Sequence, residues 1–543
     1  MIFNQAYSQS EYGYLNVDCG GDGGSIDDNN IRWSADYGFA KQGYKKTIDK
    51  SINDNYPMKT LREFPYMNKN CYILPAFIQQ KYLLRAGFFY GNYDGLSRPP
   101  IFDLQFDANS WTTVFTSNDQ PVFYEAVIIA KWHNISVCLQ RTRQDDVPFI
   151  STLQIMQLLP GMYTNMKNDH ALFKEYRLNF GSNQTVSYPD DKYGRIWEPA
   201  PKNNYKDITA DFQTLLSTVN DDPPNAAMRT AIQSESPSDP ILLSFNLTEF
   251  ARPLYIALYF TEVSKLNPRQ NRTFDIYISG QDFNLQLSPV YQKCNEVHGY
   301  VVPTPGMSKI ILSLVPSENS NMPPILNAME LFTVSETVSS GTAPQDVFGL
   351  GLITHFSSRL SQWSGDPCLP VPFDWIACNQ DNPSRITALY LANSDILFIS
   401  NISDMQALQI IDLQNNSLLS VPSFIWDLPN LKSINLAYND IRGTVPESIV
   451  EREVSLNITG TNLIVIEPKK KSHKGLIIGL SVAAGIALIG IAAFVFICIC
   501  RNGERKVSTV EISNQTVTDT VNGSEEQLNN NVNDTTGEAG IRA

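Results

Sequence analysis

Two stretches of the chain place apolar side chains at every second position. These positions are Tyr82, Leu84, Ala86 and Phe88 in one stretch, and Leu254, Ile256, Leu258 and Phe260 in the other. In both stretches a Phe-Asp pair follows the final aromatic residue at the same spacing, 14 positions (102 − 88 and 274 − 260). A period of two predicts half-buried strands, and the intervening segments are rich in Gly, Pro, Asn and Asp, as turns are. Residues 12–335 are therefore predicted to form two similar β-sandwiches in tandem.

A different pattern, L-x-x-L-x-L-x-x-N-x-L, follows further along the chain. It is matched by Leu408, Ile411, Leu413, Asn416 and Leu418, by Leu431, Ile434, Leu436, Asn439 and Ile441, and more weakly by Ile386, Leu389, Leu391, Ser394 and Ile396. The period is 22 (413 − 391) and then 23 (436 − 413). Each repeat supplies one strand, and its Asn side chain bonds backbone groups in the turn. With a degenerate copy near Asn462, these repeats predict a short solenoid over residues 385–465.

Residues 475–500 carry no charge and are long enough to cross a bilayer as a helix. Both flanks are basic, so the distribution of Lys and Arg does not set the orientation. We expect a single transmembrane helix here, followed by a disordered cytoplasmic tail over residues 501–543, which is rich in Asn, Thr, Glu and Gly.

Glycosylation acceptors and cysteines favour an extracellular N-terminal side. Seven N-x-[ST] sites precede the predicted span, at Asn134, Asn183, Asn246, Asn271, Asn401, Asn415 and Asn457, along with six of the eight cysteines. Cys368 and Cys378 are close enough to predict a local disulfide, whereas Cys19, Cys71, Cys138 and Cys294 can pair in several ways or stay free. Residues 1–30 contain no apolar segment like that of a signal peptide, and we expect that a first exon is missing. The predicted location is the plasma membrane, crossed once.

Composition narrows the functional classes. The chain has 543 residues, enough for several domains, with 43% hydrophobic and 18% charged residues, as in globular proteins. The net charge of −14 (41 − 55) would repel phosphate backbones, so nucleic acid is not an expected partner.

Several longer motifs resemble a known family. YLNVDCGG at 14–21, the Arg32-Trp33 pair, YPDDKYGRIWEP at 188–199, and LYIALYFTEV leading to NRTFDIYISG resemble the paired malectin-like domains of plant receptor-like proteins and receptor kinases. WSGDPCLPVPFDWIAC at 363–378 is similar to the Gly-Asp-Pro-Cys segment that joins those domains to leucine-rich repeats. The resemblance implies a mainly β protein with malectin-like sandwiches over 12–165 and 170–335 and a capping segment over 362–380 before the repeats. The Ser, Thr, Gly and Pro residues in the first half of 336–361 predict a linker there.

One loop is a candidate ligand-binding site. After Phe88 the chain reads FYGNYDG, in which rings of Phe89, Tyr90 and Tyr93 can stack on sugars while Asn92 and Asp94 accept hydroxyl hydrogen bonds. Animal malectin, a more distant resemblance, uses an aromatic pair in this loop, and here Tyr93 matches one member while Asn92 replaces the other. The second copy has Ser264 and Lys265 there. The alternative is that Tyr90 and Tyr93 only pack the loop.

No catalytic chemistry, metal site or cofactor is predicted. The five histidines are scattered, and the segment after Cys500 contains no glycine-rich loop, strand lysine or HRD motif of a kinase. We expect a receptor-like glycoprotein that binds an extracellular carbohydrate or peptide, or another receptor, and signals through a partner kinase, with the bilayer around its span. The alternatives are a non-signalling tether to wall polysaccharide, or a kinase-truncated form of a malectin-like receptor kinase.

Overall fold

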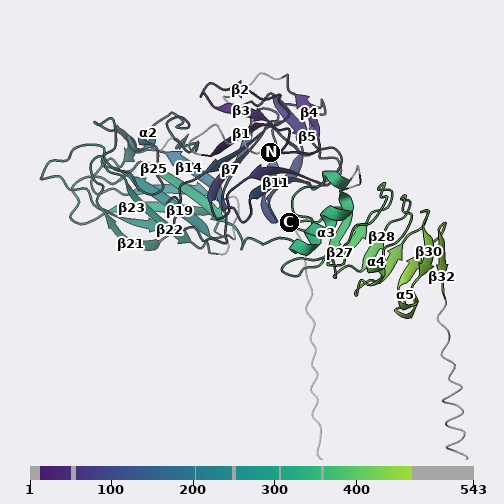
Figure 1. The fold of residues 1–543 in the computed structure, drawn as a ribbon. Helices are drawn as coiled ribbons and strands as arrows, with labels where there is room; N and C mark the ends of the chain where they lie inside the picture. The colour runs from purple at the N-terminus through teal and green to yellow at the C-terminus, as the bar shows by residue number, and fades with distance from the viewer. Residues whose placement is uncertain are drawn as a thin grey trace, which may run out of the picture. The chain divides into compact units, whose positions relative to one another are not determined.

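The structure is a computed structural model that describes residues 13–49, 57–201, 204–247, 252–304, 307–355, 357 and 360–466 (Figure 1). The predicted span at 475–500 and the tail at 501–543 lie outside these residues. Across the described ranges, every helix is too short or too polar to cross a bilayer.

The first sandwich consists of two four-stranded layers and a small additional sheet. One layer contains, in spatial order, β1 (Tyr14–Asp18), β13 (Thr152–Gln157), β7 (Lys81–Phe88) and β10 (Val122–Ile129). The other contains β6 (Lys69–Pro75), β11 (Asn134–Arg141), β8 (Ile101–Phe106) and β9 (Asn109–Phe115). The small sheet contains β12 (Phe149–Ile150), β5 (Thr60–Glu63) and β4 (Tyr44–Thr47). The side chains of Leu84, Leu104 and Val137 meet in the core between the layers.

The second sandwich repeats this arrangement strand for strand. Its layers are β14 (Leu172–Asn179), β25 (Ala328–Val334), β19 (Leu254–Phe260) and β22 (Asn295–Val301), and β18 (Ile241–Asn246), β23 (Lys309–Pro316), β20 (Phe274–Ile278) and β21 (Gln281–Leu287). Its small sheet is β24 (Ile325–Leu326), β17 (Thr230–Gln233) and β16 (Lys206–Thr209). The two alternating stretches form the equivalent strands β7 and β19, as the period of two predicts.

The two copies also share a buried tryptophan and the strand that follows it. The indole Nε1 of Trp33 donates to Asp27, six residues earlier, at 3.0 Å, and that of Trp197 donates to Asp191, also six residues earlier, at 2.7 Å. Next to each tryptophan the chain pairs in parallel with the first strand of its sandwich. These strands are β3 (Arg32–Ala35) on β1 and β15 (Glu198–Pro199) on β14, with β2 (Ser25–Ile26) at the edge of β3. The aspartate therefore fixes the tryptophan that follows the first strand of each copy.

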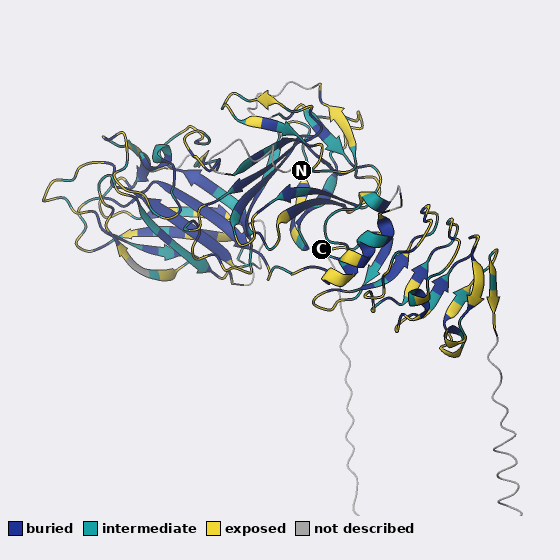
Figure 2. Cartoon of the chain, in the orientation of Figure 1, coloured by how far each residue is buried: buried dark blue, intermediate teal, exposed yellow. Residues whose placement is uncertain are grey.

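The expectation that the alternating strands are half-buried is wrong. Strand β10 pairs with β14, so that the inner layers of both sandwiches form one continuous sheet, and the side chains of β19 are buried on both faces (Figure 2). On the second face, Leu83 and Tyr255 pack against residues of covering loops and the short helix α2 (Asn225–Met228), including Met162, Trp197 and Met228. The alternating apolar residues reveal only the face that packs inside each sandwich. The second face was missed because it also contains buried polar side chains, which hydrogen-bond to one another.

The repeats form a parallel sheet. β27 (Ile386–Tyr390), β28 (Ile410–Asp412), β29 (Ser433–Asn435) and β31 (Ser455–Asn457) pair in parallel, and β26 (Ile376–Cys378) is antiparallel to β27. Ala388, Ile410, Ser433 and Ser455 are successive partners across this sheet, so four repeats contribute strands. Between these strands the chain forms α4 (Ser423–Trp426), α5 (Glu447–Glu451) and β30 (Arg442–Val445), and β30 pairs in parallel with β32 (Asn462–Val465). Asn439 Nδ2 donates to the Leu413 and Leu436 carbonyls at 2.9 and 3.0 Å, which confirms the expected role of this residue.

The interval predicted as a linker, residues 336–361, contains the helix α3 (Pro344–Thr354) and the start of η2 (Leu360–Gln362). Leu350 and Ile353 of α3 are buried in the core of the solenoid. The buried Asp346 carboxylate accepts from Arg385 Nε at 2.8 Å and from the backbone of Ile386. The helix α3 is thus the first layer of the solenoid, because its apolar residues pack against the repeats. The sequence predicted a loop here because the segment is rich in Ser, Gly and Pro.

The structure contains two disulfides among the described residues. One joins Cys368 to Cys378, the pair that the spacing suggested. The other joins Cys71 to Cys138, which lie opposite each other on β6 and β11. Cys19 and Cys294 are unpaired and buried.

Candidate ligand-binding site

The predicted binding loop after β7 does not present the aromatic faces expected of it. Phe89 and Tyr90 are both 0% exposed, so neither ring is available to a ligand. The ring of Tyr90 packs edge-on against Tyr93 with centroids 5.6 Å apart, and it also contacts Phe149. The alternative in which these tyrosines pack the loop agrees with this geometry, because the residues that continue β7 remain within the core.

The polar residues of this loop are exposed but are already engaged in its turns. Asn92 Oδ1 accepts from the backbone of Ser97 at 2.7 Å. Asp94 Oδ1 accepts from the backbone of Leu96 at 3.0 Å and from the Tyr90 hydroxyl. A sugar hydroxyl would have to share these acceptors, so Asn92 and Asp94 serve the shape of the loop first.

Tyr93 connects the loop to the small sheet. Its side chain is partly buried, and burial, followed by the nearby Glu63 carboxylate, raises the pKa of Tyr93 well above its ordinary range. The phenol is therefore neutral and its hydroxyl can act as a hydrogen-bond donor at all physiological pH values.

A different aromatic pair is exposed on the same sandwich. Tyr44, on β4, and Tyr66, just after β5, are 50% and 71% exposed, and their rings pack edge-on with centroids 5.9 Å apart. Glu63 is the cross-strand partner of Tyr44, and its carboxylate lies 3.3 Å from the Lys46 ammonium group. Sequence reasoning missed this pair because the two tyrosines are well separated along the chain and only the pairing of β4 with β5 brings them together.

A shallow hollow lies where the first sandwich meets the capping segment. It is lined by Gln42, which lies two residues before Tyr44, by Met67, which follows Tyr66, and by Trp363 of the capping segment. Its free volume of about 10 Å³ holds no more than about one water molecule. A ligand of this region must therefore lie across the surface rather than inside a cavity.

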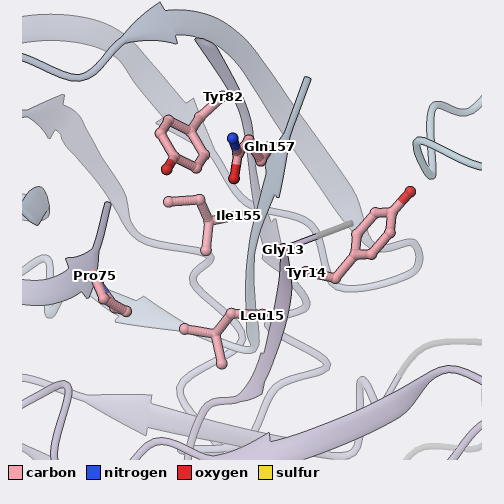
Figure 3. A pocket seen from close by; sticks show the side chains of 7 residues that line it. All are labelled: Gly13, Tyr14, Leu15, Pro75, Tyr82, Ile155 and Gln157. Atoms are coloured by element: carbon pink, nitrogen blue, oxygen red, sulfur yellow. The ribbon is translucent and has the colours of Figure 1, made fainter. Parts of the chain in front are cut away.

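A second hollow, beside β1 and β13, is also small. Leu15, Pro75, Tyr82 and Ile155 surround it, while Figure 3 shows the ring of Tyr14 directed away from these side chains. Its volume of about 20 Å³ leaves room for about one water molecule and excludes a sugar ring.

The capping segment is fastened to the first sandwich by a buried lysine. Lys69, 1% exposed, donates from Nζ to the carbonyls of Asp366, Leu369 and Val371 at 2.7, 2.7 and 3.0 Å. Burial lowers the pKa of Lys69 to about 8. The ammonium group also lies 5.2 Å from the ring centroid of Phe373. Three carbonyls and a ring face thus replace the water that the charge loses.

The Gly-Asp-Pro-Cys residues have distinct roles at this junction. A Cβ on Gly365 would lie 2.5 Å from Cys71 Sγ, so only glycine allows the segment to pack on the Cys71–Cys138 disulfide. Asp366 Oδ1 accepts from the backbone of Cys368 and Leu369 at 2.9 and 2.8 Å, and Oδ2 accepts from the backbone of Thr342 at 2.7 Å. The motif therefore holds the start of the solenoid against the sandwich that carries Tyr44 and Tyr66.

A buried charge network connects the two sandwiches. Arg177, on β14, donates from NH1 to Glu125 of β10 and from Nε to Glu330 of β25, each at 2.5 Å. Glu125 also accepts from Arg85 Nε at 2.8 Å. Although burial opposes its ionisation, Arg85 and Arg177 hold the pKa of Glu125 well below its ordinary range. Two guanidinium groups balance two carboxylates, which fixes one sandwich against the other.

The motif at 188–199 packs over the charged side chains of this network: the Gly194 carbonyl accepts from Arg85, and the Arg177 guanidinium lies 5.9 Å from the ring centroid of Trp197. Arg195 Nε donates to Asp191 at 2.8 Å, and the same aspartate accepts from Trp197. All three side chains are buried. The motif thus has a structural role. Across the described ranges, no cluster of three His, Cys, Asp or Glu side chains is arranged to hold a metal ion.

The sequence and the fold place this chain in a known class. The malectin-like domain family model matches residues 17–334, and the chain belongs to this family. Two relatives from Arabidopsis thaliana, both named as probable LRR receptor-like serine/threonine-protein kinases, are 30% and 32% identical to it. The matches cover 75% and 72% of this chain, and 48% and 47% of those proteins. The chain thus spans about half the length of the curated relatives it matches.

Solved structures show the same fold. The ectodomain of ANX2 from Arabidopsis thaliana has a TM-score of 0.53 at 15% identity, and the plant receptor-like kinase FER has 0.52 at 19%. Each comparison covers 60% of this chain and 97% of the other. The mainly β, malectin-like architecture expected from the sequence is confirmed by these likenesses and by the family match.

Proposed function

We propose that this chain is a receptor-like protein of the plant plasma membrane whose extracellular side binds a ligand at the surface around Tyr44 and Tyr66. The exposed Tyr44–Tyr66 pair carries this proposal, since two partly exposed rings offer a large contact area at a small entropic cost. The names of the relatives support a receptor role. In this view the span at 475–500 anchors the chain in the bilayer.

An extended peptide is the ligand that the surface favours. β4 is an edge strand of its sheet, and all four of its residues are exposed. A peptide can pair with such an edge through its backbone while the two tyrosine rings hold its side chains. One solved structure with this fold is of the plant peptide RALF23 in complex with FER and LLG2, which supports a peptide and a co-receptor here. A carbohydrate stacked on the rings is the alternative ligand.

Signalling is proposed to pass through a partner kinase. The fastened junction at Lys69 keeps the solenoid in a defined position next to the ligand surface, so that a co-receptor can contact both at once. Ligand then favours the assembled complex because it gains contacts only there, and the shared membrane raises the effective concentration of the partners.

The first test is ligand binding by the full chain in detergent or nanodiscs. Panels of apoplastic peptides and wall oligosaccharides are screened, and the double variant Tyr44→Ala, Tyr66→Ala is compared with Tyr37→Ala. Tyr37 is 79% exposed on the same sandwich and is outside the pair. We expect the double variant to lose at least about tenfold in affinity and the control to bind normally. Equal affinities for all three proteins would exclude this surface.

The second test addresses the partner kinase. The tagged chain is purified from plant membranes with and without the ligand, and associated kinases are identified by mass spectrometry. Ligand-dependent recovery of one kinase supports the receptor. Oligosaccharide binding without any associated kinase would instead support the tether to wall polysaccharide.

A further inference from the structure

Two neighbouring turns of the first sandwich expose large apolar side chains. The turn at 76–80 precedes β7 and the turn at 130–133 precedes β11. They are joined by backbone bonds from Ala76 to His133 at 3.0 Å and from Gln79 to Ala130 at 2.8 Å. Ile78 is 40% exposed and Trp132 is 50% exposed. Phe77, beside Ile78, is 53% exposed, so these two joined turns gather several exposed apolar side chains, and grouped apolar side chains mark a surface that something covers.

The sequence places a glycan acceptor beside this indole. Asn134, the first residue of β11, is exposed and begins the acceptor Asn134-Ile135-Ser136. Trp132 stands two residues earlier, in the bend that leads directly into β11, so the indole and the acceptor side chain leave the backbone within one short segment. Of the seven acceptors before residue 475 and the three after residue 500, this is the only one with an aromatic residue at that position.

We propose that Asn134 carries an N-linked glycan whose first sugar rests on the indole face of Trp132, so that the chain's own glycan covers this apolar tip. The C–H groups on one face of a pyranose suit the electron-rich face of an indole, while its hydroxyls remain in water at the rim. This inference rests on the extracellular placement in the proposed function, since only chains that enter the secretory pathway receive such glycans.

The buried state of the acceptor serine dictates when the glycan is attached. Ser136 is 5% exposed, and its hydroxyl donates to Asp107 at 3.3 Å. The transferase must reach this hydroxyl, so attachment precedes the pairing of β11 with β6. The glycan is then already present when Trp132 comes to the surface, and the indole is covered from the time the sandwich folds.

The test uses the full chain, produced with an added secretory leader in plant cells. Site occupancy is measured by glycopeptide mapping, and the exposure of Trp132 by hydroxyl-radical labelling. Asn134→Gln removes this glycan alone, and Asn183→Gln, at an exposed acceptor of the second sandwich, is the matched control. Because a sugar covers one of the two faces of an indole, we expect labelling of Trp132 to about double in N134Q and to stay unchanged in N183Q.

A second variant tests the contact from the other side. In Trp132→Ala the glycan at Asn134 loses its contact with the indole, so an endoglycosidase should release it several-fold faster, while release at Asn183 keeps its rate. Equal labelling of Trp132 in wild type and N134Q would overturn the proposal. Occupancy of Asn183 without occupancy of Asn134 would overturn it too. Absence of glycans from every acceptor would also overturn the extracellular placement.

Discussion

The ammonium group of Lys69 lies 2.7 Å from the carbonyl oxygen of Leu369, 300 residues later in the chain. This bond and its two neighbours join the first sandwich to the capping segment of the solenoid. The local sequence around Lys69, in β6, looks like an ordinary strand. What makes the lysine special is the capping segment, whose carbonyls converge on a charge that has no access to water.

Replacement of Lys69 should loosen the junction. Lys69→Met keeps the aliphatic stem but leaves three buried carbonyls without a donor, so we expect a loss of about 3 kcal/mol in the stability of the junction. Hydrogen exchange at the amides of Cys368 and Leu369 measures this loss directly. Lys41→Met is the matched control, because Lys41 reaches the carbonyls of Ser361 and Trp363 from an exposed position at 3.3 and 3.4 Å. If both variants exchange at the wild-type rate, Lys69 does not hold the junction.

The sequence predicts those features of this protein that depend on a local period. Strands β7 and β19, the repeat strands and the role of Asn439 follow from short spacings along the chain, where the backbone geometry decides which side chains share a face. The Cys368–Cys378 disulfide, ten residues apart, is of the same kind.

The remaining features depend on contacts between distant segments. The pairing of Cys71 with Cys138 needs the register of β6 against β11, and the meeting of Tyr44 and Tyr66 needs that of β4 against β5. The burial of Tyr90 depends on its contact with Phe149 of β12, a strand that comes much later in the sequence. A composition that suits an exposed loop also suits a loop packed on its own tyrosines, so sequence alone did not distinguish the two.

Gly20 allows the backbone to pass close to another strand of the first sandwich. Its φ is +85°, and a Cβ would collide with the Leu61 carbonyl oxygen; Gly181, at the equivalent position of the second sandwich, has φ +72° and the same conflict with Ala231. Gly20→Ala should therefore lower the free energy of unfolding by about 4 kcal/mol, from backbone strain and overpacking together. Gly24→Ala, at φ +79° in open space, should cost only about 1 kcal/mol. Urea denaturation compares the two variants, and equal losses would show that the close approach is unimportant.

Replacement of Arg177 should weaken the contact between the two sandwiches and lower the stability of the chain. Arg177→Met leaves Glu125 and Glu330 buried without one of their counter-charges, and we expect a loss of about 3 to 5 kcal/mol in the free energy of unfolding. Arg442→Met is the control, because the side chains of Arg442 and its partner Asp440, 3.7 Å apart, are 76% and 59% exposed, and exposed pairs contribute about 0 to 1 kcal/mol. A thermal melt in which both variants behave alike would argue against the network as the brace between the sandwiches.

A carboxyl group at the far side of this network should make stability depend on pH. Asp221 is 0% exposed, and its Oδ2 accepts from the Tyr259 hydroxyl at 3.1 Å. Burial, then the carboxylates of Glu296 and Glu330, raise the pKa of Asp221 from 3.8 to about 7. Between these two values the folded chain holds a proton that the unfolded chain has released. The contribution of this group to stability is therefore fully present below pH 3.8 and is lost as the pH rises to about 7.

The variant Asp221→Asn isolates this contribution, because an amide resembles the protonated carboxyl and does not titrate. Relative to D221N, the wild type should lose about 2 to 3 kcal/mol of unfolding free energy between pH 5 and pH 7.5, since each pKa unit corresponds to about 1.4 kcal/mol. Urea denaturation measures the unfolding free energy of both proteins at the two pH values. Because all other titrating groups are present in both proteins, their contributions cancel when the variant is subtracted from the wild type. Parallel pH profiles for wild type and variant would mean that Asp221 is ionised in the folded chain, and that Arg195, whose NH1 donates to the Asp221 backbone carbonyl at 2.7 Å, compensates its charge.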